Sequence, residues 1–234
     1  MDSRYKDYIE KKVPTMNENV KLPGPIVTIS RECGCSAKRI ATKLSKILSG
    51  YSYKSETKTD VEWRWISKEI IEESASELHM NSDRIRNVFL SERKTRLEDV
   101  KNAFSTDKMY DADDQRVIDT VSNVILDFIY KGNFIIVGRG GVALAHEMPN
   151  SLNIKLEAPL EWRINRIMQI SNMSKADARD YVLSIDNQRE LFVEHIAGRK
   201  IISCDYDLVF NYSTLKDDHI VDAVVSILRN RGMI

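Results

Sequence analysis

The sequence predicts an α/β fold, a parallel β-sheet with helices packed on both of its faces. Predicted strands and helices alternate along the chain. At least three of the predicted strands, 26–30, 134–137 and 152–156, are apolar enough to be buried on both faces. Strands of this kind, connected by helices, are typical of a sheet that lies between two helical layers. Ligands of such sheets bind beyond the C-terminal ends of the strands, so the loops that follow the strands are the candidate site.

Length and composition are those of a globular protein. The 234 residues are enough for one large domain, or for a domain with a small lid. Basic and acidic side chains balance at 35 each, which does not favour nucleic acid as the main partner. No apolar run approaches the roughly 18 residues that a membrane-spanning helix needs. The charged N-terminus lacks the apolar core of a secretion signal, and three cysteines are too few for a disulfide framework, so we expect a cytoplasmic protein.

The chain begins with a polar extension, 1–22, which has no clear hydrophobic period. We expect residues 23–234 to form the folded domain. A Pro-Gly-Pro cluster at 23–25 breaks regular structure just before the first strand. Apolar residues at helical spacing then predict a helix over about 37–49, which Gly50 is well suited to end.

The region that follows is the least regular. Residues 51–53 fit the start of a strand. A helix is expected over 67–78, with Ser67 as its N-cap. Residues 81–83, Asn-Ser-Asp, are suited to cap a further short helix, and the stretch 91–111 is charged and irregular.

The second half of the chain has clearer patterns. A strong apolar stripe predicts a helix over 112–131, and the strand 134–137 follows it. After the strand 152–156, Ala158-Pro159 opens a helix, because proline is favoured at the first helical position.

Two further helices and a strand complete the predicted domain. Ser174 and Asp177 have the spacing of a capping box, with aspartate in place of glutamate, at the start of a long helix that Gly198 ends. Residues 206–210 form the last predicted strand, and 216–230 form an amphipathic helix.

The segment 26–40 combines a strand, a loop of small residues and the start of a helix. The loop residues are 34–37, and Lys38 and Arg39 follow them. Backbone N–H groups at a helix start, the helix dipole and nearby cations together are suited to bind phosphate. The standard sequence G-x-x-x-x-G-K-[ST] is absent, so the segment alone fits a phosphate-binding loop and an ordinary strand-to-helix turn equally well.

A second loop, Gly-Arg-Gly-Gly at 138–141, directly follows a buried strand. Because the loops 31–37 and 138–141 both follow strands of one parallel sheet, we expect them to lie side by side over one crevice. Arg139 lies between glycines that let a ligand approach the backbone, and its guanidinium can bind phosphate through two hydrogen bonds. This arrangement favours a ligand contact for Arg139 over an ion pair at the surface.

Two pairs of charged residues have helical spacing. Arg163 and Arg166 lie three residues apart, so they share a helix face and can clamp a polyphosphate. In isolation, a solvated helix face that includes Glu161 is the simpler explanation. Asp186 and Arg189 repeat the spacing. Arg189 could bind a phosphate while Asp186 binds a sugar hydroxyl, but in isolation an ion pair within the helix is the simpler explanation.

A metal site is not indicated by the sequence. The four histidines show no metal-binding spacing, and no fourth ligand accompanies the three cysteines. Trp63 and Trp65 fit packing better than stacking on a base.

Taken in order, these motifs resemble the cytidylate kinase-like family of P-loop nucleoside monophosphate kinases. They are an Ile-Thr-Ile-Ser-Arg-like strand and loop, Gly-Arg-Gly after a strand, Ala-Pro-x-x-x-Arg-x-x-Arg, Asp-x-x-Arg and Tyr-Asp-Leu-Val. The resemblance covers about residues 24–228. It implies a P-loop NTPase-type three-layer αβα fold with a parallel five-stranded sheet. It also implies a helical region that binds a nucleoside monophosphate (NMP), at about 51–111, and a short lid at about 163–189.

The resemblance further implies a reaction and a set of residues. In the presence of Mg²⁺, ATP would donate its γ-phosphoryl group to a nucleoside monophosphate, cytidylate (CMP) by the family's name. The ATP phosphates would contact the residues Gly34, Cys35, Ser36, Ala37, Lys38 and Arg39. The acceptor would contact Arg139, Asp186 and Arg189, and the transfer itself would depend on Lys38, Arg163 and Arg166. Phosphoryl transfer needs positioning and positive charge more than a covalent nucleophile, which agrees with this set.

The loop departs from the family pattern at several positions. The phosphate-loop lysine of true cytidylate kinases falls on Ala37, and Ser36 and Ala37 replace two glycines. Gly140 stands where those kinases have an aspartate after the arginine. Two alternatives to an active nucleotide kinase therefore remain. One is a kinase-like protein that binds a nucleotide and regulates a partner without turnover, and the other is a pure interaction domain.

Overall fold

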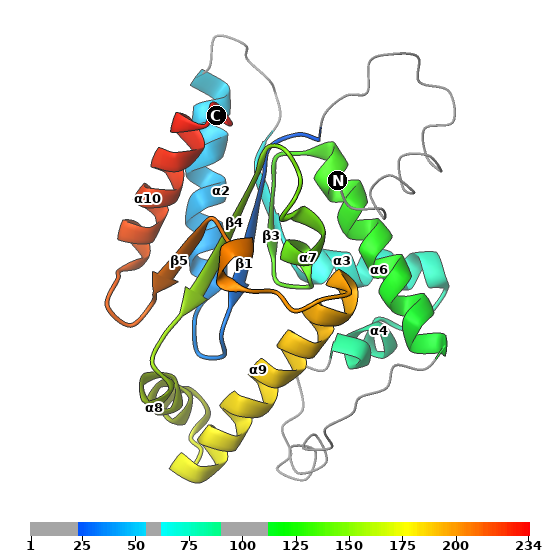
Figure 1. Cartoon of the computed structure of the whole chain (residues 1–234), viewed down its shortest axis with the longest axis vertical. Helices are drawn as coiled ribbons and strands as arrows, with labels where there is room; N and C mark the ends of the chain where they lie inside the picture. The colour runs from blue at the N-terminus through cyan, green and yellow to red at the C-terminus, as the bar shows by residue number, and fades with distance from the viewer. Residues whose placement is uncertain (1–22, 55–61, 90–111) are drawn as a thin grey trace.

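The computed structural model describes residues 23–54, 62–89 and 112–234. The predicted extension, 1–22, and the irregular stretch 91–111 lie outside the described residues. Figure 1 shows the described part as a single sheet with helices on both sides. Within these ranges, no helix combines the length and the apolar character needed to cross a membrane.

The sheet has five parallel strands in the order β2-β3-β1-β4-β5. In chain order the strands are β1 (Ile26–Arg31), β2 (Arg64–Ile66), β3 (Phe134–Val137), β4 (Ser151–Glu157) and β5 (Leu208–Asn211). β1 lies in the middle, paired with β3 on one side and with β4 on the other. Because every pairing is parallel, all five strands end at the same edge of the sheet. The predicted fold class is confirmed.

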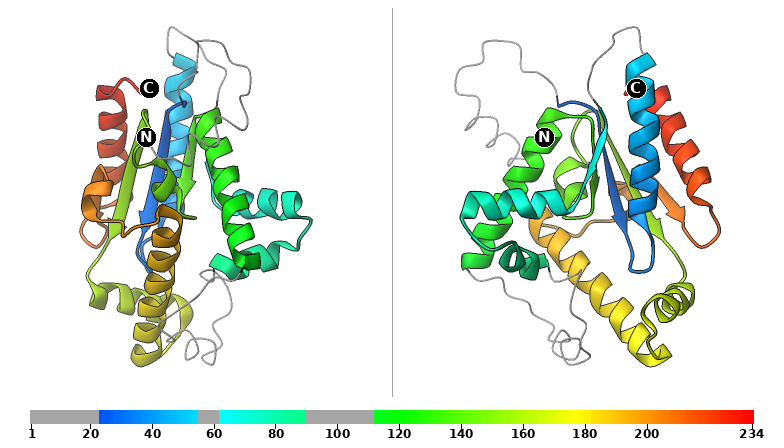
Figure 2. Two further views of the ribbon diagram at one scale, coloured as in Figure 1. Left: turned by 45° about the vertical axis from the view of Figure 1, so that its right-hand side comes forward. Right: turned by 180° about the vertical axis from the view of Figure 1, so that it is seen from behind.

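Helices cover both faces of the sheet. The helices on one face are α2 (Ala37–Lys54) and α10 (Asp217–Asn230). Those on the other face are α3 (Lys68–Leu78), α4 (Ser82–Phe89), α6 (Ala112–Lys131), α7 (Gly141–Ala145) and the second half of α9 (Lys175–Ala197). Figure 2 shows this separation from two sides. The remaining elements are α8 (Leu160–Ser171), beyond the C-terminal edge of the sheet, and a 3₁₀ turn, η1 (Ser203–Asp205).

Alternation along the strands divides the interior into two apolar cores. Val27 and Ile29 of β1 face α2 and α10, whereas Ile26 faces the opposite core. The β4 residues in the α2/α10 core are Leu152, Ile154 and Leu156. Residues of this kind on alternate positions are what fixes the register of a buried strand.

The other face of β4 is polar. Its side chains are Ser151, Asn153 and Lys155, which alternate with the apolar residues. Asn153 accepts a hydrogen bond from Thr28 on β1 over 2.6 Å, and it donates one to Ser151 over 3.1 Å. Polar groups buried in this way are satisfied by one another. The row continues through Lys155 to Glu157, the last residue of β4, at the edge where the strands end.

Several predicted elements have the bounds that the patterns indicate. The helix over 112–131 is confirmed as α6. Ser174 caps α9 by accepting a hydrogen bond from the amide of Asp177, and Gly198 ends that helix with a φ of 67°. Ser67 precedes α3, but its hydroxyl makes no cap hydrogen bond; instead its amide donates to Glu69 over 2.9 Å.

Other elements differ from the prediction. Gly50 does not end the first helix, because α2 continues to Lys54, so the predicted strand at 51–53 is helical. No neighbour lies within 4 Å of a Cβ placed on Gly50, so a surface turn of helix simply continues through it. The strand that the sequence places at 51–53 is found further along the chain, as β2. Pro159 is the N-cap residue of α8 rather than its first helical residue.

The predicted lid, at about 163–189, falls on α8 and the first half of α9. These helices pack on each other around a small apolar core made of Ile164, Ile167, Ala178, Val182 and Ile185. Cys33, from the loop after β1, belongs to the same core. The two helices therefore pack directly on the predicted phosphate loop, while their action as a lid stays a prediction.

Candidate functional site

A pocket opens at the C-terminal edge of the sheet, between the end of β1, the loop after β3, and α9. We call it the α9 pocket. Its charged and glycine residues include Arg31, Glu32, Gly138, Arg139, Lys155, Asp186 and Arg189. The two loops that were expected to lie side by side over one crevice do so here.

Arg139 lies in a strained turn at the wall of this pocket. Its φ is 58°, and the flanking Gly138 and Gly140 have φ values of 70° and 75°. Glycine adopts this left-handed region freely, whereas arginine does so only at an energetic cost. The arginine is also buried, with 6% of its surface exposed. Strained backbone of this kind concentrates at ligand sites, which favours a binding role for Arg139.

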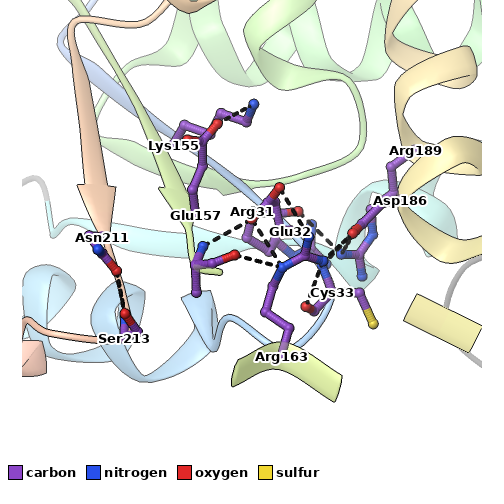
Figure 3. Close-up of polar contacts among 11 residues, drawn as sticks. Arg31, Glu32, Cys33, Lys155, Glu157, Arg163, Asp186, Arg189, Asn211 and Ser213 are labelled. Atoms are coloured by element: carbon purple, nitrogen blue, oxygen red, sulfur yellow. Dashed lines mark hydrogen bonds and ion pairs between the residues drawn. The ribbon is translucent and has the colours of Figure 1, made fainter. Parts of the chain in front are cut away.

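Arg163 is buried beneath the loop after β1, with 7% of its surface exposed. Its Nε donates to the carbonyl of Ala158 over 2.9 Å, and its two terminal nitrogens donate to Glu32 and Asp186. Nη1 also lies 3.5 Å from the carbonyl oxygen of Cys33. Figure 3 shows the guanidinium between the two carboxylates. We call these five residues the Arg163 brace, because they connect α8, α9 and the loop.

Asp186 and Arg189 both contact the segment that leaves β1. The amide of Cys33 donates to Asp186 over 2.6 Å, so this loop amide is already bonded within the protein. Arg189 donates to the carbonyl of Arg31 over 3.2 Å, and its Nη1 lies 4.0 Å from Asp186. The three predicted acceptor residues, Arg139 included, therefore meet at one pocket.

Burial shifts the pKa values of three groups in this loop. It is the largest influence on Glu32, whose pKa is raised although the Ala158 amide and Arg163 act in the opposite direction. Burial also raises the pKa of Cys33 to about 11 and that of Cys35 to about 12. Both thiols stay protonated near neutral pH, so neither is suited to act as a nucleophile or a metal ligand.

A second pocket, which we call the α10 pocket, lies between the start of α2, α8 and the loop before α10. Its lining residues are Arg39, Lys43, Arg166, Tyr212, Leu215, Lys216, Asp217 and Asp218. Arg39 donates to the hydroxyl of Tyr212 over 3.1 Å and pairs with Asp217 over 3.0 Å. The guanidinium of Arg166 lies 5.1 Å and 5.3 Å from the ring centres of Trp162 and Tyr212, within cation–π range. Arg163 and Arg166 thus contact different groups although both lie on α8.

Comparison with known families decides what kind of protein carries these pockets. A family model described as the cytidylate kinase-like family matches residues 26–214, most of the chain. The chain belongs to this family. The α9 pocket lies wholly within the matched residues, whereas Leu215, Lys216, Asp217 and Asp218 of the α10 pocket lie just beyond them.

Individual relatives are more distant. A uronate isomerase of Corynebacterium glutamicum is 32% identical over 105 residues, which are 43% of this chain and 20% of that protein. The chain thus spans about one fifth of the length of this curated relative. An uncharacterized protein from Eubacterium ventriosum has a similar structure, with a TM-score of 0.58 and 18% identity over 88% of this chain and 98% of its own. A shikimate kinase from Bacteroides thetaiotaomicron gives a TM-score of 0.47 at 9% identity, over 90% and 99% of the two chains.

In this cytidylate kinase-like chain, the predicted phosphate loop leads into α2 without a buried lysine. Ala37, at the position of the usual lysine, is the first residue of α2 and is 3% exposed. The neighbouring Lys38 is exposed on the helix surface. Gly34 has a φ of 93°, and a Cβ there would lie 3.2 Å from the Cβ of Arg163. Gly34, the one glycine of the loop, therefore lies where α8, a helix of the predicted lid, packs on the loop.

Most lining residues of the α9 pocket were not predicted as site residues from the sequence, among them Arg31, Glu32, Lys155 and Tyr206. Lys155 pairs with Glu157 over 2.6 Å and lies 5.5 Å from the ring centre of Tyr206. The alternation along β4 contains a signal for Lys155, because Leu152, Ile154 and Leu156 define the opposite face. No comparable pattern marks Tyr206, which precedes its strand.

No metal cage is formed by the described side chains. Across residues 23–54, 62–89 and 112–234, no three histidine, cysteine, aspartate or glutamate side chains come together as ligands. The carboxylates nearest the loop, Glu32 and Asp186, are both engaged by Arg163. A metal ion that reaches this site therefore has to bring most of its ligands with it.

Proposed function

We propose that the chain is a nucleotide kinase that transfers the γ-phosphoryl group of ATP to a nucleoside monophosphate such as CMP. One observation carries this proposal: the segment 31–39 connects the two pockets. Its first residues, Arg31 and Glu32, line the α9 pocket, and its last residue, Arg39, lines the α10 pocket. A loop placed in this way can hold the phosphates that pass from a donor on one side to an acceptor on the other.

The α9 pocket is suited to the acceptor. Arg139 and Arg189 can bind a phosphate dianion, since guanidinium forms paired, charge-assisted hydrogen bonds with phosphate oxygens. Asp186, fixed by the Arg163 brace, offers carboxylate oxygens that can accept hydrogen bonds from sugar hydroxyls. The predicted NMP-binding region, 51–111, contributes α3 and α4 on the same side of the sheet.

The α10 pocket is suited to the donor. The residues Gly34, Cys35, Ser36 and Ala37 lead into α2, whose first amides lack partners inside the helix and can receive phosphate oxygens. Lys38 and Arg39 lie in the first turn of that helix. Arg166, stacked on two aromatic rings, supplies a cation that can stabilise the charge on the transferring group.

Arg163 has a different place in this proposal from the one that the resemblance implies. All three of its guanidinium nitrogens are bonded to protein oxygens. We therefore assign it to positioning the loop, and we assign the transfer itself to Lys38 and Arg166.

Mg²⁺ fits the site only as a companion of the nucleotide. Mg²⁺ keeps several waters and binds through substrate phosphates with one or two protein oxygens, so it does not need a protein cage. Among the described residues, the hydroxyl of Ser36 and the carboxylate of Glu32 are candidate oxygens for it. The ion would supply charge neutralisation at the phosphates.

The test is ADP release measured with a coupled assay across CMP, UMP, AMP and GMP. We expect release that depends on one of these acceptors and falls at least tenfold in Arg189→Met. The matched control is Arg229→Met, which removes an arginine stacked on Tyr51 at the surface of α10, far from both pockets. Intact ATP binding without acceptor-dependent release by the wild type would exclude the kinase.

The second candidate is a nucleotide-binding regulatory protein without turnover. The buried Ala37 at the lysine position and the Cys33 amide already taken by Asp186 favour it. This candidate predicts measurable affinity for ATP and no transfer, even after Ala37→Lys. Robust turnover by the wild type would exclude it.

A further inference from the structure

We propose that Arg31 is a third contact to the acceptor phosphate, beside Arg139 and Arg189, and that Gly138 is required to place it. This inference rests on the proposed acceptor role of the α9 pocket. It adds a residue and a positioning device to that site, and it commits the acceptor to a chemical class. The acceptor carries a phosphate dianion that is surrounded by three guanidinium groups. An acceptor with only a neutral hydroxyl group does not fit this site.

The contact between Arg31 and Gly138 is the first step of the argument. Arg31 is the last residue of β1, and its guanidinium lies over the loop that follows β3. A Cβ added to Gly138 would overlap Nη1 of Arg31, and Gly138 also has a φ of 70°. The loop is fixed there, because the Gly138 amide donates to the Ile29 carbonyl over 3.0 Å. Only glycine at this position leaves the observed place of the Arg31 side chain open.

The second step is the convergence of three arginines from three elements. Arg31 comes from β1, Arg139 from the loop after β3, and Arg189 from α9, and all three line the α9 pocket. Arg189 donates to the Arg31 carbonyl over 3.2 Å, which ties α9 to the end of β1. Guanidinium groups arranged around one space match a tetrahedral dianion, whose oxygens accept several hydrogen bonds at once.

The third step concerns the charges that could oppose this role. The acidic side chains that line the pocket are Glu32, Asp186, Glu190 and Glu194. Glu190 pairs with Lys200 over 3.3 Å, and Glu32 and Asp186 both accept hydrogen bonds from Arg163. The buried guanidinium of Arg163 thereby offsets part of their negative charge. An anion in the pocket is then met by the field of the three arginines, and by Lys155 on the floor.

The test uses two substitutions that reach the same guanidinium by different routes. Arg31→Met removes it, and Gly138→Ala displaces it while every charge is kept. We expect each to weaken CMP binding by about 10- to 100-fold in calorimetry, the effect of losing a hydrogen-bonded charged group, with ATP affinity changed less than threefold. The double variant should bind CMP no more weakly than Arg31→Met alone, because both changes act on one interaction.

Gly198→Ala is the matched control. Gly198 also has a positive φ, 67°, but nothing lies within 4 Å of an added Cβ. It therefore imposes the same kind of backbone strain without displacing an arginine, and CMP affinity should stay at the wild-type value. Circular dichroism establishes that each variant is folded, and Arg31→Met decides the question if Gly138→Ala does not fold.

The outcomes separate this inference from the proposed kinase. Wild-type CMP binding that Arg31→Met leaves unchanged would overturn the inference, as would an equal loss of CMP and ATP affinity. A wild-type chain that binds neither CMP nor inorganic phosphate would overturn it too. Absence of ADP release, with CMP binding still sensitive to Arg31→Met, would overturn the kinase proposal and support the inference.

Discussion

Replacement of Arg163 by methionine tests the brace that connects α8, α9 and the phosphate loop. Methionine keeps much of the side-chain volume but leaves Glu32 and Asp186 without their shared cation. Removing one partner of a buried ion pair typically costs about 3–5 kcal/mol. The two carboxylates keep 27% and 24% side-chain exposure, so water can solvate part of each. We therefore expect a loss of about 2–4 kcal/mol in the free energy of unfolding, or roughly 4–16 °C in Tm for a domain of this size.

The loss should depend on pH in a defined direction. Burial raises the pKa of Glu32 and Arg163 opposes that rise, so without Arg163 the pKa of Glu32 in the folded chain rises further above its value in the unfolded chain. The folded chain then binds more protons than the unfolded chain between these pKa values, so stability increases as pH falls. The deficit of Arg163→Met relative to the wild type should be largest near pH 8 and should shrink toward pH 5.

Urea unfolding followed by circular dichroism measures the effect, with the slope of the transition checked for constancy. Arg166→Met is the matched control on the same helix, and it should cost about 1 kcal/mol or less because it loses only partly exposed cation–π contacts with Trp162 and Tyr212. Adding Glu32→Gln and Asp186→Asn to Arg163→Met should restore part of the stability, since no unpaired charge remains. A stability of Arg163→Met within about 0.5 kcal/mol of the wild type at pH 8 would refute the reasoning.

Arg139→Ala should weaken CMP by at least tenfold and ATP by less than threefold, since Arg139 lines only the α9 pocket; equal effects in calorimetry would contradict this assignment. Iodoacetamide at pH 8 should label the exposed Cys204 in the native chain and leave Cys33 and Cys35 unmodified until urea is added, because burial raises their pKa values to about 11 and 12; mass spectrometry reads the sites, and native labelling of either buried thiol would be inconsistent with the structure. Burial raises the pKa of Glu32, so the folded chain holds an additional proton above the unfolded pKa and its stability falls as pH rises through that window. Glu32→Gln should flatten this part of the curve of unfolding free energy against pH, and an unchanged curve would show that the group does not titrate differently on folding.

The elements that the sequence predicts well are those with long, periodic apolar patterns. α6 coincides with the predicted helix because its apolar residues recur at helical spacing from Val117 to Ile129. β2 is harder to predict, because it has only three residues. The buried Trp63 lies just before it, so the apolar pattern does not show where the strand begins. The continuation of α2 past Gly50 reflects packing of the rest of that helix, which outweighs the local preference of one glycine.

The site shows a comparable division. Strand ends of a parallel sheet converge, so Arg139 could be placed beside the loop after β1 from the order of the elements alone. Arg163 could not be placed, because helical spacing says that it shares a face with Arg166 but not which neighbours that face meets. The two side chains lie about 60° apart around α8, and this difference turns one toward the buried carboxylates and the other toward the aromatic rings.

The distribution of charge around the donor side leads to one further conclusion about how such a kinase would work. Arg39 and Lys43 line the α10 pocket, but they pair with Asp217 and Asp218, which offset much of their charge. The loop itself has alanine in place of the usual lysine. Arg166 differs from Arg39 and Lys43, because its guanidinium contacts aromatic rings and not a carboxylate. Phosphoryl transfer depends on positive charge at the moving group. In the proposed kinase, Arg166 on one face of α8 would supply this charge, while Arg163 on the adjacent face of α8 would hold the loop in place.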